Sequence, residues 1–169
     1  MTTAVASKPV VFRARYPLTH ASTLAGRQSA LAAALGRCRN AQERLAWLVD
    51  RARQRPSLPD DFRTAAHRVP GCLSQLWLVA EFRDGRCWFR CDSDSQVVRA
   101  MALLVAEVYS GCTPAEILGD NYEWLAGLGW QQLLTPNRRN AQARTWEQIR
   151  AFAASQLERA PDFSADVTG

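Results

Sequence analysis

Apolar residues recur with two different periods along this chain. Residues 24–38 and 95–109 carry Ala-, Leu- and Val-rich runs typical of helices, and the second run has the more apolar face. Residues 74–82 and 86–91 instead alternate apolar and polar side chains, as half-buried strands do. Asp84-Gly85 between them is the typical sequence of a type I′ turn. The pattern therefore predicts one antiparallel β-hairpin between helical segments.

Capping signals predict where several helices begin. Residues 113–116 combine a capping box with Pro at the first helical position. Thr135-Pro136 predicts the start of a long final helix that ends near Arg159, before a proline. Two aspartates within residues 92–94 precede the most apolar helix. We expect them to cap it, because acidic groups stabilise the positive end of a helix.

The order of these elements predicts the fold class. Helices lie before and after a single hairpin, without the alternation of strand and helix that builds a parallel sheet, so we expect an α+β domain. Its small antiparallel sheet, the hairpin plus a third strand from residues 63–69, would pack against several helices. With 169 residues, one domain is expected. We place it at residues 24–160, between a flexible basic extension (residues 1–23) and a loose tail (residues 161–169).

Charge and hydropathy exclude two broad classes of partner. The net charge is +5, but residues 1–42 hold six cations and no acid, which leaves −1 on the rest of the chain. A domain with balanced charge lacks the basic stripe of a nucleic-acid-binding protein, so no nucleic acid is expected. No apolar run approaches the ~20 residues that span a bilayer, so no membrane is expected either.

The basic extension leaves the location of the protein open between two alternatives. A flexible leader of a bacterial protein predicts a cytoplasmic location. An extension poor in acids and containing Arg and Ser also resembles an organellar transit peptide, although it lacks a strong amphipathic pattern.

The cysteines favour free thiols over disulfides or a metal site. There are five, an odd number, and no secretory signal precedes them, which favours a reducing compartment. Cys87 and Cys91 lie on one face of a strand about 13 Å apart, at ~3.3 Å per residue, too far to share a zinc ion. We therefore expect no metal, and no motif for a bound nucleotide cofactor is present. No role is assigned to Cys38, Cys87, Cys91 or Cys112.

Cys72 is the candidate for chemistry. Pro70-Gly71 predicts a bend that brings this thiol to the start of a strand, where it would be presented to a partner. Arg68 is close in sequence and Arg138 is expected to be close in space, and positive charge favours the reactive thiolate. The alternative is that Cys72 is a small buried apolar residue, the commoner fate of a free cysteine.

A thiol hydrolase would need a base beside this cysteine. The chain has two histidines, His67 near Cys72 and His20 in the extension. His67 is the candidate base, but no cysteine-hydrolase signature accompanies it, so a surface position in a loop is the preferred interpretation.

Several motifs in the same order resemble the SufE/CsdE family of sulfur-acceptor proteins. The resemblance spans roughly residues 31–152 and is carried by Val69, Gly71, Cys72, Ser74, Gln75, Trp77, residues 91–95, residues 109–118 and residues 134–138. It implies the α+β fold of that family. The matched positions imply that Cys72 becomes the persulfide and that Arg138 stabilises an anion or the partner.

The resemblance also implies the partners. The protein would accept persulfide sulfur from a PLP-dependent cysteine desulfurase, stimulate that enzyme, and pass the sulfur to an iron–sulfur cluster scaffold or another acceptor. It would be a sulfur carrier rather than a stand-alone enzyme, a monomer or homodimer, and would bind no cofactor, since PLP belongs to the desulfurase. The alternative is a regulatory module that binds the desulfurase without carrying sulfur.

Three positions depart from the family pattern. Leu73 replaces a polar residue after the cysteine, Cys91 replaces a Gly, and Asn140-Ala141 replaces a pair that ends in Gly. These departures concern the choice of partner and the details of docking more than the fold.

Overall fold

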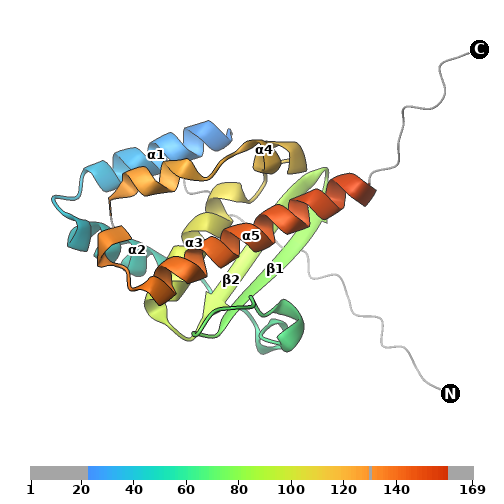
Figure 1. The fold of residues 1–169 in the computed structure, drawn as a ribbon, viewed down its shortest axis with the longest axis horizontal. Helices are drawn as coiled ribbons and strands as arrows, with labels where there is room; N and C mark the ends of the chain where they lie inside the picture. The colour runs from blue at the N-terminus through green and yellow to red at the C-terminus, as the bar shows by residue number, and fades with distance from the viewer. Residues whose placement is uncertain (1–22, 130, 160–169) are drawn as a thin grey trace, which may run out of the picture.

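A central helix, α3, organises the computed structural model, which describes residues 23–129 and 131–159. The β-hairpin packs on one side of α3, the long helix α5 crosses both, and the shorter helices surround the remaining sides (Figure 1). In chain order the elements are α1 (Leu24–Gly36), α2 (Ala41–Arg53), the 3-10 helices η1 (Asp60–Phe62) and η2 (Ala65–His67), β1 (Leu76–Arg83), β2 (Arg86–Ser93), α3 (Gln96–Tyr109), α4 (Pro114–Gly119), the 3-10 helices η3 (Glu123–Leu128) and η4 (Gln131–Leu133), and α5 (Pro136–Arg159). The predicted α+β class is confirmed. The predicted extension up to residue 22 and the tail from residue 161 lie outside the described residues.

The predicted hairpin is confirmed. β1 and β2 pair antiparallel, with Leu78 opposite Cys91 and Ala80 opposite Phe89. At the turn, Asp84 has φ 53° and Gly85 has φ 72°, the two positive values that a type I′ turn requires. The alternating pattern sets which face is buried, and Cys87, Phe89 and Cys91 all point into the core.

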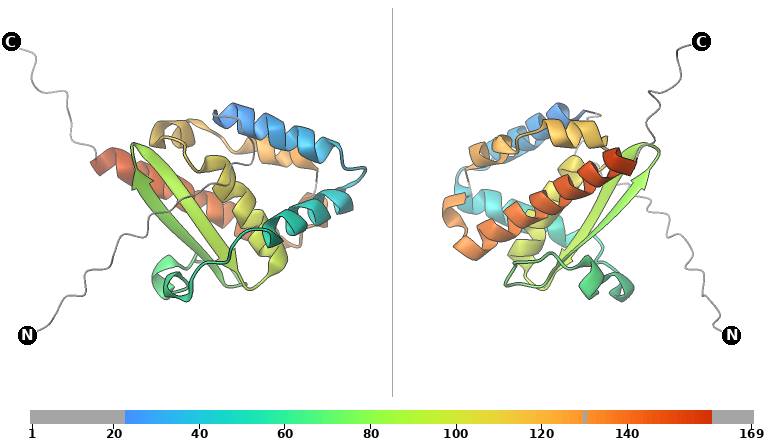
Figure 2. Two further views of the ribbon diagram at one scale, coloured as in Figure 1. Left: turned by 180° about the vertical axis from the view of Figure 1, so that it is seen from behind. Right: turned by 45° about the vertical axis from the view of Figure 1, so that its right-hand side comes forward.

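The third strand expected from residues 63–69 is reduced to one bridge, so the sheet has two strands. Arg68 pairs with Trp77, and the N–H of Val69 donates to the carbonyl of Leu76 at 2.8 Å. The ladder ends there because η2 precedes it and Pro70, which follows, has no N–H to donate. Figure 2 shows this connector beside the open end of the hairpin, away from its turn.

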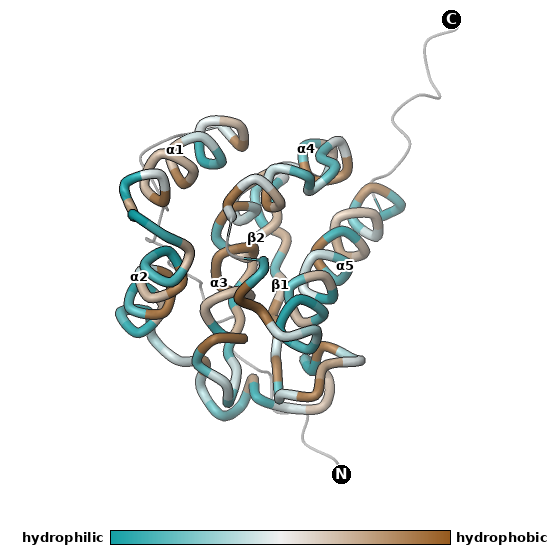
Figure 3. Tube along the Cα trace, turned by 60° about the vertical axis from the view of Figure 1, so that its left-hand side comes forward, coloured by the Kyte–Doolittle hydropathy of each residue, from teal (hydrophilic) through white to brown (hydrophobic). Residues whose placement is uncertain are grey.

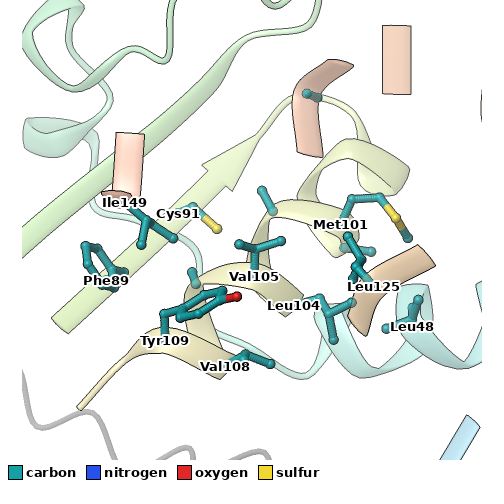
Figure 4. Close-up of a cluster of buried hydrophobic side chains, with 14 of the residues drawn as sticks. Leu48, Phe89, Cys91, Met101, Leu104, Val105, Val108, Tyr109, Leu125 and Ile149 are labelled. Carbon is teal, nitrogen blue, oxygen red and sulfur yellow. The ribbon is translucent and has the colours of Figure 1, made fainter. Parts of the chain in front are cut away.

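α3 is largely buried, which agrees with the apolar face that its sequence predicted. Nine of its 14 residues are buried. Val105 lies toward Ile149 of α5, and Leu104 lies beside Leu48 of α2 and Leu125 of η3, all in one apolar cluster (Figure 4). α2 and α5 lie at the surface and alternate between hydrophilic and hydrophobic along their length, as helices with one face in the core do (Figure 3). Among residues 23–129 and 131–159, no helix has the length and apolar character needed to cross a membrane.

Helix capping was predicted correctly at α4 and wrongly at α3. Thr113 accepts a hydrogen bond from the N–H of Glu116, whose carboxylate accepts from the N–H of Thr113, which completes the capping box. At α3 the capping side chain is Ser95, which accepts from the N–H of Val98. The expected cap at residues 92–94 is wrong because β2 continues to Ser93 and places the first aspartate in the strand.

Candidate functional site

Cys72 lies on a turn, residues 70–75, that joins the connector to β1. We call this segment the Cys72 turn. The residues that flank the turn are held together by a hydrogen bond from the N–H of buried Val69 to the carbonyl of Leu76. Gly71 has φ 77°, which L side chains rarely adopt, so the turn needs glycine here. Cys72 itself is half-buried, whereas the side chain of Leu73 is 80% exposed.

Two residues of α5 hold the Cys72 turn from one side. Asn140 donates from Nδ2 to the carbonyl of Gly71 at 2.7 Å. The side chain of Arg144 lies so close that a Cβ on Gly71 would be 3.2 Å from its Nε. Asn140 and Arg144 are four residues apart and therefore share one face of the helix. This face of α5 forms a wall of the site.

The junction between β2 and α3 holds the other side of the Cys72 turn. The N–H of Gln75 donates to the carboxylate of Asp94 at 3.0 Å, and the N–H of Asp94 returns a bond to the carbonyl of Gln75 at 3.2 Å. The hydroxyl of Ser93 donates to the same carbonyl at 2.6 Å. Cys72 therefore lies between two anchored ends of one short segment.

The buried carboxylate of Asp92 holds together the chain segments next to this junction. It accepts from the N–H of Leu58 at 2.9 Å, from Arg63 at 2.8 Å and from Arg99 at 2.8 Å. Burial by itself would raise the pKa of Asp92. The hydrogen bonds from the N–H groups of Leu58 and Ser93, the charge of Arg99 and the hydrogen bond from Arg63 together outweigh burial. They hold the pKa below its ordinary value. The ionised carboxylate thus links α3 to the chain segment that carries Leu58 and Arg63.

The charges around Cys72 act in opposite directions on its thiol. Burial raises the pKa of Cys72, and the positive charges of Arg144 and Arg68 partly offset that rise. The result is a pKa above the ordinary value, so the thiol form dominates at neutral pH while the turn is in this position. Removing the burial would leave the two arginines acting alone, and they favour the thiolate.

The other cysteines lie in different surroundings. Cys87, Cys91 and Cys112 are buried. Burial raises the pKa of Cys87 and of Cys112 to about 11 each, and raises that of Cys91 further. Cys38 is half-buried just after α1. These positions confirm that Cys87 and Cys91 are core residues of the sheet.

Arg138 and His67 were the other two residues considered for the site. Arg138 is half-buried in the first turn of α5, whereas the arginine whose side chain reaches the Cys72 turn is Arg144. His67 pairs through Nδ1 with the hydroxyl of Thr64 at 3.2 Å and packs against the ring of Phe62. The ring of His67 is thus engaged within its own connector, half-buried in η2 rather than at the surface of a loop.

Sequence reasoning missed Asn140 and Arg144 as site residues. Their spacing of four residues could have placed them on the same face of α5. No local signal connects that face to Gly71, which lies 69 residues earlier than Asn140. The buried partners of Asp92 were missed for the same reason.

A pocket of about 220 Å³ adjoins the connector just before the Cys72 turn. It is lined by residues 66–69, by Leu78 and Ala80 of β1, and by Gln148, Ala151 and Phe152 of α5. Among residues 23–129 and 131–159, no cluster of three or more His, Cys, Asp or Glu could hold a metal ion. The candidate reactive group at the site is the Cys72 thiol, on which the charges of Arg144 and Arg68 act.

The fold and the site define a class of small α+β protein with a cysteine on an anchored turn. Comparison with known families matches residues 29–153 to SufE, described as an Fe-S metabolism associated domain. The chain belongs to the SufE family, which confirms the resemblance seen in the sequence and places the protein among those associated with iron–sulfur metabolism.

Individual relatives agree with this assignment. A protein of Synechocystis sp., described as an uncharacterized SufE-like protein, is 32% identical over 98 residues, which cover 58% of this chain and 60% of that protein. The solution structure of a hypothetical protein from Thermus thermophilus superposes with a TM-score of 0.62, at 19% identity, over 80% of this chain and 96% of that one. The second likeness supports the fold alone.

Proposed function

We propose that this protein accepts sulfane sulfur on Cys72 from the persulfide of a PLP-dependent cysteine desulfurase and stimulates that enzyme. The observation that carries the proposal is the position of Cys72, on a turn fixed at both ends and flanked by Arg68 and Arg144. Membership of the SufE family supplies the class of partner.

The transfer step is a thiol–persulfide exchange. The thiolate sulfur of Cys72 attacks the outer sulfur of the donor persulfide and forms a new S–S bond. The S–S bond of the donor breaks, and its electron pair leaves on the donor cysteine as a thiolate. The proton of the Cys72 thiol is released before the attack. The total oxidation state of sulfur is unchanged, so no external oxidant or reductant takes part.

The resting position of the Cys72 turn protects the thiol, and docking of the desulfurase exposes it. At rest, burial raises the pKa of Cys72 and keeps it protonated. When the turn moves outward, burial is lost and the charges of Arg144 and Arg68 favour the thiolate. Leu73, 80% exposed at the tip of the turn, is the apolar side chain best placed to meet the partner. Arg138 and the neighbouring Arg139 bind acidic groups of the partner.

The same reasoning extends to the next step and to the location. A Cys72 persulfide is itself a sulfur donor, and the second thiol belongs to an iron–sulfur cluster scaffold or another acceptor. Both exchanges need a reducing compartment, so the proposed location is the cytoplasm. The protein acts as a carrier, as a monomer or homodimer, and the PLP remains with the desulfurase.

A regulatory module that binds the desulfurase without carrying sulfur is the second candidate. The half-buried, protonated resting state of Cys72 favours it, because a thiol in this state is a poor nucleophile. The test is the rate of alanine release by a cysteine desulfurase with wild-type protein and with Cys72→Ser. Loss of stimulation in the variant supports the carrier. Full stimulation by Cys72→Ser supports the module and excludes the carrier.

A further inference from the structure

We propose that Arg144 is the cation that holds the anionic sulfur of Cys72, as the thiolate before transfer and as the persulfide after it. The inference deepens the proposed function and rests on it. Arg144 would act as a positioning residue, because it acts through the sulfur that reacts. This assigns to the third turn of α5 a role that the motif around Arg138 does not cover.

The geometry of the guanidinium group carries this proposal. Measured to the position of a Cβ on Gly71, Arg144 Nε lies at 3.2 Å, Cζ at 3.6 Å and Nη2 at 3.7 Å. The edge with Nε and Nη2 therefore faces the backbone next to Cys72. The other terminal nitrogen, Nη1, donates to Glu147 at 2.8 Å. Glu147 thus orients the guanidinium group and leaves two N–H donors facing the Cys72 turn.

The neighbouring charges single out Arg144. Several charged side chains lie around the Cys72 turn. Arg68 lies on the connector, and Arg144 and its partner Glu147 lie on α5. Asp94 is bound to Gln75 at the end of the turn. Of the two arginines that act on the thiol, Arg144 has the larger effect. Arg68 belongs to the connector that leads into the turn, whereas Arg144 is fixed to a long helix packed on α3. The backbone of Arg144 can therefore stay in place on α5 while the Cys72 turn moves.

The exposure of Arg144 suits a group that follows a moving sulfur. Its side chain is 45% exposed, so it has room to extend on its flexible stem when the turn swings outward. Partial exposure also means that replacing Arg144 should leave the fold intact, since substitutions of exposed side chains usually change stability little. Variants of Arg144 can therefore be compared as folded proteins.

The test is the pH profile of Cys72 alkylation by iodoacetamide, measured by peptide mapping without any desulfurase. In Arg144→Gln the midpoint should move to higher pH, and the rate near neutral pH should fall roughly threefold, because the thiolate loses the cation with the larger effect on it. Arg144→Lys should return the profile close to wild type. Arg150→Gln, which removes an exposed arginine further along α5, is the matched control and should change nothing.

An unchanged midpoint in Arg144→Gln, or a shift to lower pH, overturns the proposal. A midpoint in Arg144→Lys as high as that in Arg144→Gln also overturns it, because lysine keeps the positive charge that the proposal requires. The pH profile of alkylation is measured without sulfur transfer, so it tests the role of Arg144 separately from the proposed function. If Arg144→Gln shifts it but wild-type protein accepts no sulfur, the proposed function fails while Arg144 remains the cation of the Cys72 thiolate.

Discussion

Asn140 of α5 donates a 2.7 Å hydrogen bond to the carbonyl of Gly71, the residue directly before Cys72. This bond connects a helix near the end of the chain to the backbone of the reactive turn. It also opposes the outward movement that the proposed transfer needs. The strength of this bond should therefore set how often Cys72 is exposed.

Asn140→Ala should loosen the Cys72 turn and make the thiol react faster. Losing the bond removes one anchor, and a more exposed thiol loses part of the burial that raises its pKa. We expect alkylation near neutral pH to accelerate roughly two- to fivefold, with a stability loss of about 1 kcal/mol. Stopped-flow alkylation and urea unfolding measure the two effects. Asn137→Ala, an exposed position in the first turn of α5, is the control, and slower alkylation in Asn140→Ala would contradict this role.

Asp92→Asn should destabilise the protein by roughly 2–4 kcal/mol, because it leaves Arg63 and Arg99 around an uncharged side chain. Urea unfolding near neutral pH measures this loss. Asp60→Asn is the matched control: Asp60 also pairs with Arg63 but is fully exposed, so little change is expected. Equal stability of Asp92→Asn and wild type would show that the buried network does not stabilise the fold.

The same carboxylate predicts how stability depends on pH. The pKa of Asp92 is lower in the folded protein than its unfolded value of about 3.9, so its contribution is fully present above that pH. The contribution is lost as pH falls through the folded pKa, which steepens the loss of stability in acid. The unfolding free energy of Asp92→Asn should therefore fall less steeply below about pH 4 than that of wild type. Parallel curves would contradict this assignment.

The five cysteines should separate into two groups by reactivity. Iodoacetamide should label Cys72 and Cys38 in the native protein, because both are half-buried. Cys87, Cys91 and Cys112 are buried, so they should react at least about 100-fold more slowly, after local or global opening. Peptide mass mapping with and without urea measures the difference. Rapid native labelling of Cys87 or Cys112 would show that the edge of the hairpin opens more easily than this packing allows.

The sequence predicted those parts of the structure that depend on neighbouring residues. The hairpin follows from alternation and Asp84-Gly85, and the start of α4 follows from the capping box at Thr113. The Cys72 turn was predicted from Pro70-Gly71, and the positive φ of Gly71 is the reason for that glycine. These features are local, so a short stretch of sequence is enough to identify them.

Features that join distant segments were missed or misassigned. Asp92 looks like a helix cap in sequence, but its partners Leu58 and Arg63 come from a segment about 30 residues earlier. Arg144, which reaches Gly71, was missed, while the role of Arg138, chosen for its motif, stays a prediction. The third strand expected from residues 63–69 is a single bridge, because η2 precedes it and Pro70 follows it. The differences at Asp92 and Arg144 depend on tertiary packing.

The most direct test of the proposed function is intact-protein mass after incubation with a cysteine desulfurase and cysteine, beside Cys72→Ser. The proposal predicts that wild-type protein gains the mass of one sulfur atom on the peptide that contains Cys72, that a reductant removes it, and that Cys72→Ser gains none. An equal gain in Cys72→Ser, or no gain in a wild-type protein that still stimulates the desulfurase, would contradict sulfur transfer through Cys72.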